Sequence, residues 1–340
     1  MTAPRPAARP RAATAALALA LAAAGGACTD LDALGGSEPL LPWSESAPRG
    51  ANTPRAAGTP PYRATAAIED GALELRTDLP RAPAGCLEDQ APALCGDVDR
   101  DGLVDEWEDL ALDALRPFVR IDEGDPLRVD REGRVGSIGR VWPAAGDARA
   151  GPIRLVLVLA YSRDYGRCSF GAHLGDSERV ALDLAPVPGE RGAVRVVRAY
   201  TAAHEWSDKD VSRLFAGDLS RQLEVEEDPI TGQPRWVVHA SRSKHATYAT
   251  AALCEAQDSW IFCGDEDCDS GPASLQSELL MPVDNAGEPD APRVLRMMDE
   301  PVWDDVPFCG GLGHGDGPCA SPLRDKLLDD PFAGSAGQDG

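Results

Sequence analysis

The sequence feature that most constrains the fold of this 340-residue chain is a set of four short runs of apolar and β-branched residues. Each run is bounded by glycine, proline or aspartate. They occupy residues 153–161, 179–184, 193–200 and 236–239. Runs of this length and composition are typical of β-strands. Only two segments have a helical spacing of apolar residues, one that begins near Asp105 and one at 208–214. Because few helices are available to connect parallel strands, the sequence predicts a mainly β fold, a β-sandwich with one short helix at its N-terminal side.

The first residues have the three-part pattern of a secretory signal peptide, which we place at residues 1–27. Three arginines precede an apolar run without acidic residues, and small residues follow that run before Cys28. A cysteine in this position is typical of a bacterial lipoprotein, in which Cys28 becomes the acylated N-terminus and holds the protein at a membrane. Residues 25–27 also fit ordinary signal cleavage. The protein is therefore expected in the cell envelope, facing the periplasm or the surface, or else secreted.

Composition divides the rest of the chain into three parts. Residues 28–85 are rich in alanine, proline, glycine, serine and threonine without a regular apolar period, and this predicts a disordered tether. The polar, glycine-rich residues 321–340 predict a disordered tail. A single β-sandwich domain is therefore expected at residues 86–320, a length that suits one domain.

The cysteine count fits an oxidising compartment. Of the nine cysteines, acylation of Cys28 would leave an even set of eight for disulfides. Spacing favours two local pairs, Cys86 with Cys95 and Cys309 with Cys319. The others would pair among themselves in an order that the sequence does not fix; they are Cys168, Cys254, Cys263 and Cys268.

The charge of the chain bears on its partners. The formal net charge is −23 at pH 7, and removal of the arginine-containing leader makes it more negative. Such an excess of carboxylates repels phosphate backbones and attracts divalent cations. We therefore expect no nucleic-acid partner.

Residues 97–108 match the twelve-position calcium loop of an EF-hand. Aspartates occupy positions one, three and five, Gly102 occupies the sharp turn, and a glutamate occupies the last, bidentate position. The expected ligands are Asp97, Asp99, Asp101, Leu103 through its carbonyl, Asp105 directly or through water, and Glu108. A weak structural site for Ca²⁺, with a dissociation constant of roughly 10⁻⁴ to 10⁻³ M, would suffice outside the cell. The alternative is an acidic turn that matches by chance.

Four of the five histidines lie between residues 173 and 245, beside acids or at the ends of predicted strands, and this clustering predicts one site. Three blocks occur in order, and they are His173-x-Gly175-Asp176-x-Glu178, Tyr200-Thr-Ala-Ala-His204-Glu205-Trp206 and Ser241-Arg242-x-x-His245-x-x-Tyr248. Together they resemble the vacuolar-sorting-protein-like domain family of plants and fungi over roughly residues 100–255.

The first block is also similar to the metal-site motif of the necrosis-inducing secreted proteins, which lies on a β-sandwich. This resemblance implies a second divalent-metal site with His173, Asp176 and Glu178 as ligands and Asp164 as a fourth. Ser177 stands where that motif has tryptophan, so any role of the ring is absent here. One imidazole among carboxylates suits Ca²⁺, Mg²⁺ or Mn²⁺. The alternative is that these residues form hydrogen bonds within the fold and hold no metal.

Three functions are compatible with these features. The first is a calcium-stabilised surface module that recognises a glycan or a lipid head group, as the second resemblance implies. Its ligand-binding residues would be His204, Arg242, His245 and Tyr248. The second is a metal-dependent hydrolase of esters or phosphodiesters, with His204 or His245 as the general base. The third is a purely structural envelope protein, and the sequence leaves open whether the protein is an enzyme.

Overall fold

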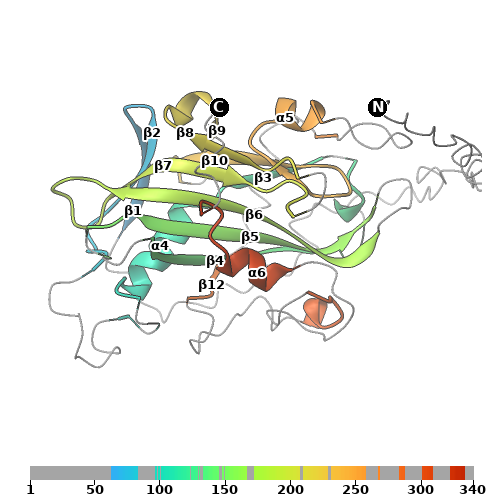
Figure 1. Cartoon of the computed structure of the whole chain (residues 1–340), viewed down its shortest axis with the longest axis horizontal. Coiled ribbons are helices and arrows are strands. Elements are labelled where there is room, and N and C mark those ends of the chain that lie inside the picture. The colour runs from blue at the N-terminus through green and yellow to red at the C-terminus, as the bar shows by residue number, and fades with distance from the viewer. Residues whose placement is uncertain are drawn as a thin grey trace, which may run out of the picture. The chain divides into compact units, whose positions relative to one another are not determined.

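The computed structural model describes residues 63–82, 96–97, 99, 101–122, 124–128, 130, 133–144, 148, 150–166, 172–206, 210–228, 231–257, 267–268, 283–287, 301–308 and 322–333. These residues form a mainly β fold with two sheets that share a core (Figure 1). The predicted β-sandwich is confirmed. The leader, Cys28 and the expected tether up to residue 62 lie outside the described residues.

The larger sheet has the strand order β1-β2-β7-β6-β5-β4-β12, and β8 pairs with β7. Its strands are β1 Ala64–Glu69, β2 Ala72–Thr77, β4 Val135–Pro143, β5 Ile153–Asp164, β6 His173–Pro186, β7 Val194–Thr201, β8 Arg213–Ala216 and β12 Val283–Asn285. The smaller sheet has the order β11-β10-β3, and β9 pairs with β10. Its strands are β3 Phe118–Ile121, β9 Glu224–Glu227, β10 Pro234–Ala240 and β11 Thr247–Tyr248. Strand pairs are antiparallel except β3 with β10 and β4 with β12.

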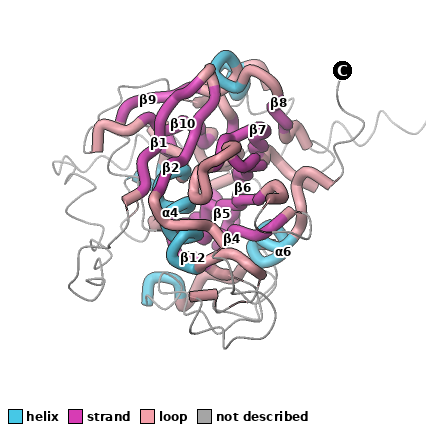
Figure 2. The backbone as a smooth tube through the Cα atoms, turned by 90° about the vertical axis from the view of Figure 1, so that its left-hand side faces the viewer, coloured by secondary structure: helices cyan, strands magenta, loops and turns pink. Residues whose placement is uncertain are grey.

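Among the described residues, the sheets are accompanied by three helices, α4 Asp105–Leu115, α5 Ala251–Glu255 and α6 Leu323–Leu328. Single 3-10 turns occur at η3 Pro126–Arg128, η4 Leu219–Arg221 and η7 Pro301–Trp303. The predicted N-terminal helix is α4, which lies against β1, β4 and β12 (Figure 2). Helices α5 and α6 are additions to the single helix that was expected. Within the described residues, no helix is long and apolar enough to cross a membrane.

Strand β5 is buried on both faces, which explains its unbroken apolar sequence. Leu155, Leu157 and Leu159 point into the core between the two sheets. Val156 and Val158 point to the other face, where they pack with residues of the C-terminal segment such as Trp303 and Leu327. The larger sheet is therefore covered on both sides along β5.

The expected tether at residues 28–85 is wrong for residues 63–82, because these include the hairpin β1–β2 at one edge of the larger sheet. Leu75 of β2 is fully buried in the core. Asp70 and Gly71 form the turn with φ values of 49° and 77°. An Asp-Gly pair between short strands is a strong hairpin signal. The alanine-rich composition concealed it.

Two further expectations are corrected. Residues 322–333 of the expected disordered tail include α6, whose Leu323 and Leu327 pack on the larger sheet. The helical spacing at 208–214 is overridden as well, since residues 210–212 are not helical and Arg213–Ala216 forms β8. Phe215 of β8 is buried in the core, so pairing with β7 gains more apolar burial than an isolated helical turn would.

One disulfide joins Cys254 of α5 to Cys268, with a Cα–Cα distance of 6.0 Å. Both belong to the set of four whose pairing the sequence left open. The remaining cysteines, and with them the two expected local pairs, lie outside the described residues.

The hairpin β1–β2 is expected to be part of the cooperative unit. Leu75→Ala should lower the free energy of unfolding by about 2 to 4 kcal/mol, because it removes a fully buried side chain and leaves a cavity. Ile68→Ala is the matched control on the same hairpin, since Ile68 is 43% exposed and should change stability little. Urea denaturation followed by fluorescence measures both. Equal, small effects would mean that the hairpin does not fold with the domain.

Candidate metal centre and buried polar network

The acidic side chains of the predicted calcium loop, residues 97–108, gather in space. One oxygen from each of Asp97, Asp99 and Asp105 lies within 4.8 Å of the other two. A second group of the same kind consists of Asp99, Asp101 and Glu108. No other set of three acidic, histidine or cysteine ligands meets this criterion in the described part of the chain. The sequence motif and the geometry therefore single out the same residues.

The backbone of the calcium loop turns where a calcium loop requires it. Gly102 has φ +93°, a conformation that glycine adopts without strain. Its N–H donates to Asp97 Oδ2 over 3.2 Å, and the N–H of Leu103 donates to Asp101 Oδ1 over 2.7 Å. The N–H of Asp105 donates to the carbonyl of Gly96 over 2.7 Å. The first two bonds hold the carboxylates of Asp97 and Asp101 toward the turn, and the third closes the backbone of the loop.

The calcium loop is anchored on the sandwich without a second EF-hand loop among the described residues. The N–H of Val104 donates to the carbonyl of Arg81 over 2.9 Å, so the segment after β2 lies beside the loop. Leu103 and Trp107 are fully buried in the core, and Trp107 Nε1 donates to the carbonyl of Gly192 over 2.9 Å. These contacts hold both sides of the loop against the sandwich.

Without a cation, electrostatic repulsion among its carboxylates destabilises the calcium loop. Several carboxylates within a few ångströms repel one another, most strongly where burial reduces screening. Glu108 is fully buried, and its Oε2 accepts from Asn285 Nδ2 over 3.2 Å. The N-terminus of α4 offsets only part of the negative charge. A hard divalent cation with oxygen ligands would neutralise this cluster.

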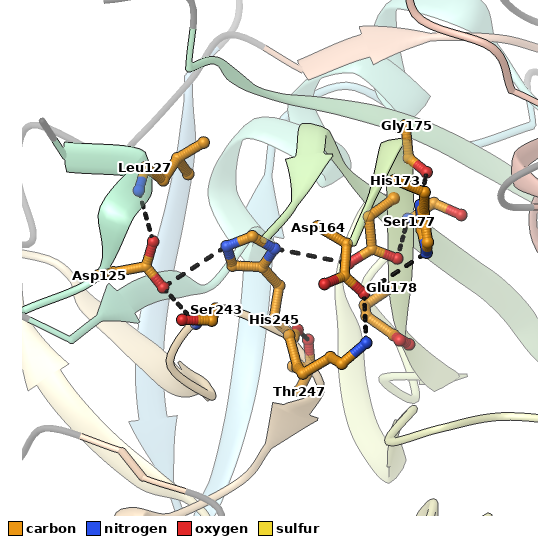
Figure 3. A network of polar contacts seen from close by, with 12 residues as sticks. Asp125, Leu127, Asp164, His173, Gly175, Ser177, Glu178, Ser243, His245 and Thr247 are labelled. Carbon is orange, nitrogen blue, oxygen red and sulfur yellow. Dashed lines mark hydrogen bonds and ion pairs between the residues drawn. The ribbon is translucent and has the colours of Figure 1, made fainter. Parts of the chain in front are cut away.

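The residues of the expected second metal site contact other polar side chains, and Asp164 and His173 contact each other (Figure 3). Asp164 Oδ2 lies 3.4 Å from His173 Nε2 and accepts from Lys244 Nζ over 3.0 Å. Asp176 faces His245, and Glu178 lies 3.3 Å from Lys326 Nζ. No three of the predicted ligands meet within 4.8 Å. A metal at these four described residues therefore stays a prediction.

His245 is the centre of this buried network. Its Nε2 lies 3.5 Å from Asp125 Oδ2 and its Nδ1 lies 3.5 Å from Asp176 Oδ2 (Figure 3). The ring stacks on Tyr161 with centroids 4.1 Å apart and planes 10° from parallel. His245 and Ser243 have positive φ values of 57° and 68°, so the turn that presents the ring is strained.

The electrostatics of the network follow from these pairings. Burial alone would lower the pKa of His245, but Asp125 and Asp176 outweigh it and raise the pKa to about 9. Burial opposes ionisation of Asp125, yet the His245 imidazolium holds the pKa of that carboxyl below its usual value. Burial raises the pKa of Glu178 to about 8 although Lys326 opposes the shift. Burial and the charge of Asp176 raise the pKa of Asp164.

The predicted ligand-binding residues differ in their exposure to solvent. Arg242 is half exposed, with its Nε 3.9 Å from Asp122 Oδ1. His204 is partly buried with φ +56°, and both His245 and Tyr248 are buried. A fully buried imidazole with a raised pKa is protonated at neutral pH, so His245 is poorly suited to act as a general base.

Four members of the network were not predicted from the sequence, and they are Asp125, Tyr161, Lys244 and Lys326. Asp125 lies directly before η3 and belongs to none of the three sequence blocks of the predicted site, so the sequence did not mark it. Lys326 belongs to α6 in the expected tail, where its buried Nζ donates to the carbonyl of Ser177. A buried lysine is informative only once the fold is known.

Comparison of the chain with protein-family models, with curated proteins and with solved structures finds no match. The resemblance to the vacuolar-sorting-protein-like family and to the necrosis-inducing proteins therefore stays a prediction.

Proposed function

We propose that this protein is an exported cell-envelope module that binds one Ca²⁺ in its calcium loop and uses the ion to fix α4 on the β-sandwich. The observation that carries the proposal is the gathering of carboxylates around the turn at Gly102 in two groups of three that share Asp99. The ligands are oxygens, which favours a hard cation over zinc or copper. The deep burial of Leu103 and Trp107 favours a structural role, because large movement of the loop would expose them.

Envelope attachment is the second part of the proposal. The signal-peptide pattern and the position of Cys28 support a lipid anchor, with the membrane as the partner that the anchor provides. The strongly acidic chain supports a compartment where calcium is plentiful, and it disfavours a nucleic-acid partner.

The calcium site is tested by metal content and titration calorimetry on the purified protein. At millimolar calcium we expect one bound Ca²⁺ per chain in the wild type and none in the double variant Asp97→Asn/Asp99→Asn, because it removes two charged ligands at once. Asp113→Asn is the matched control, since Asp113 lies on α4 but its side chain is 68% exposed and pairs with Arg116. Calcium uptake by the double variant equal to that of the control would rule out the site.

The buried network favours structure over catalysis. Its charged groups neutralise one another within the domain, as His245 does with Asp125 and Asp176. We therefore propose that the network stabilises the β-sandwich and has no catalytic role. Recognition of a glycan or lipid head group and hydrolysis of esters or phosphodiesters are the alternatives to this assignment.

A further inference from the structure

Asn285, the last residue of β12, connects the far edge of the larger sheet to the calcium loop. Its Nδ2 donates to Glu108 Oε2 over 3.2 Å and to Asp109 Oδ1 over 3.0 Å. Its Oδ1 accepts from the N–H of Gly287 over 3.0 Å, which fixes the orientation of the amide. Both donor hydrogens of the side chain are therefore directed at two consecutive carboxylates of α4.

Strand β12 is a short strand at the edge of the larger sheet. It pairs with β4 in parallel over Val283–Asn285 only, and the N–H of Ala286 donates to the carbonyl of Gly139 over 2.8 Å. Ala286 packs against the apolar cluster on the outer face of the larger sheet. A strand of three residues at a sheet edge is marginal by itself. The side-chain bonds from Asn285 to α4 should therefore matter for its docking.

We propose that Asn285 is a positioning residue for Glu108, and that calcium binding and the docking of β12 on β4 are coupled through it. This inference rests on the proposed function. A bound cation would hold the Glu108 carboxylate inside the calcium loop, where its Oε2 accepts from Asn285. Without the cation, repulsion from the neighbouring carboxylates favours another position of Glu108 and weakens that bond. Coupling of two binding events is reciprocal, so β12 docking must strengthen calcium binding.

The first test measures calcium affinity by titration calorimetry on the full protein. Asn285→Ala should weaken calcium binding about tenfold, the lower end of the loss expected for a partner that orients a metal ligand. Asn285→Asp keeps the size of the side chain but turns an acceptor toward Glu108 and Asp109, so it should weaken binding further. Gln233→Ala is the control, because it removes an amide that bonds the N–H of Ala66 and should leave affinity unchanged.

The second test measures hydrogen exchange of the wild type with calcium and with a chelator. Calcium should slow exchange at residues 101–108 and also at residues 283–287, and Asn285→Ala should keep the first effect and lose the second. Wild-type affinity in both Asn285 variants, or protection of 101–108 without any change at 283–287, would overturn the coupling alone. A wild-type protein that takes up no calcium and responds at neither segment would overturn the proposed function together with it.

Discussion

His245→Gln is expected to lower the free energy of unfolding by about 3 to 5 kcal/mol at pH 7, the usual cost of removing one partner from a buried charged group. The variant removes the cation that lies 3.5 Å from Asp125 and 3.5 Å from Asp176, and it leaves both carboxylates in the interior. It also removes the ring that stacks on Tyr161. Urea denaturation at constant pH measures the loss.

His239→Gln is the matched control for this variant. His239 is also buried, but it pairs with Glu224, which is partly exposed and can be solvated when the imidazole is absent. Its loss should therefore cost clearly less. Asp125→Asn combined with His245→Gln in a double-mutant cycle isolates the pairwise term. A cost below about 1 kcal/mol for His245→Gln, in the range of exposed ion pairs, would show that the network contributes little.

The pH dependence of stability has a definite sign. The pKa of His245 rises from 6.5 in the unfolded chain to about 9 in the folded protein. Its contribution is therefore fully present below pH 6.5 and is lost as the pH rises through 9. Glu178 acts in the same direction, because its folded pKa of about 8 lies above 4.5. The free energy of unfolding of the wild type should fall from neutral pH toward pH 9. In His245→Gln this decrease should be smaller, because the contribution of His245 is absent.

Local signals in the sequence were sufficient for β5, β6, β7 and β10 and for the grouping of acids around Gly102. The apolar run of β5 and the spacing of acids around Gly102 depend on neighbours within a dozen residues, so both appear in the sequence as they do in the structure. The hairpin β1–β2 also had a local signal in Asp70-Gly71. It was missed because the two strands contain only three of the β-branched residues that usually mark a strand, Thr65, Ile68 and Thr77, and the surrounding sequence is rich in alanine.

The buried network could not be derived in the same way. His245 was recognised as part of a site, but its partners are Asp125 before η3 and Asp176 on β6, and neither lies near it in the chain. The parallel pairing of β3 with β10 and the register of β5 with β6 bring them together. Motif reasoning identified the residue, while the topology determined that it is buried between carboxylates and is not presented to a ligand.

Two buried tryptophans anchor the two ends of α4, and their replacement is expected to separate stability from calcium affinity. Trp107 Nε1 donates to the carbonyl of Gly192 near the start of the helix, and Trp236 Nε1 donates to the carbonyl of Leu115 at its end over 2.7 Å. Both side chains are at most 1% exposed. Trp107→Ala and Trp236→Ala should each lower the free energy of unfolding by about 3 to 5 kcal/mol.

Calcium affinity should distinguish the two alanine variants. Trp107 precedes Glu108, so its loss frees the first turn of α4 to shift and misplaces the glutamate ligand. Trp236→Ala disturbs the opposite end of the helix, more than one turn away from the calcium loop, and should leave calcium affinity close to that of the wild type.

The conservative variant Trp107→Phe keeps an aromatic ring and removes one hydrogen bond. It should lower the free energy of unfolding by only about 1 kcal/mol from that bond, together with a small packing loss. Calorimetric titration below the melting temperature of each variant measures affinity on folded protein. Equal weakening in Trp107→Ala and Trp236→Ala would mean that the affinity follows the stability of the whole domain, and that the anchor beside Glu108 has no special part in holding the ligand.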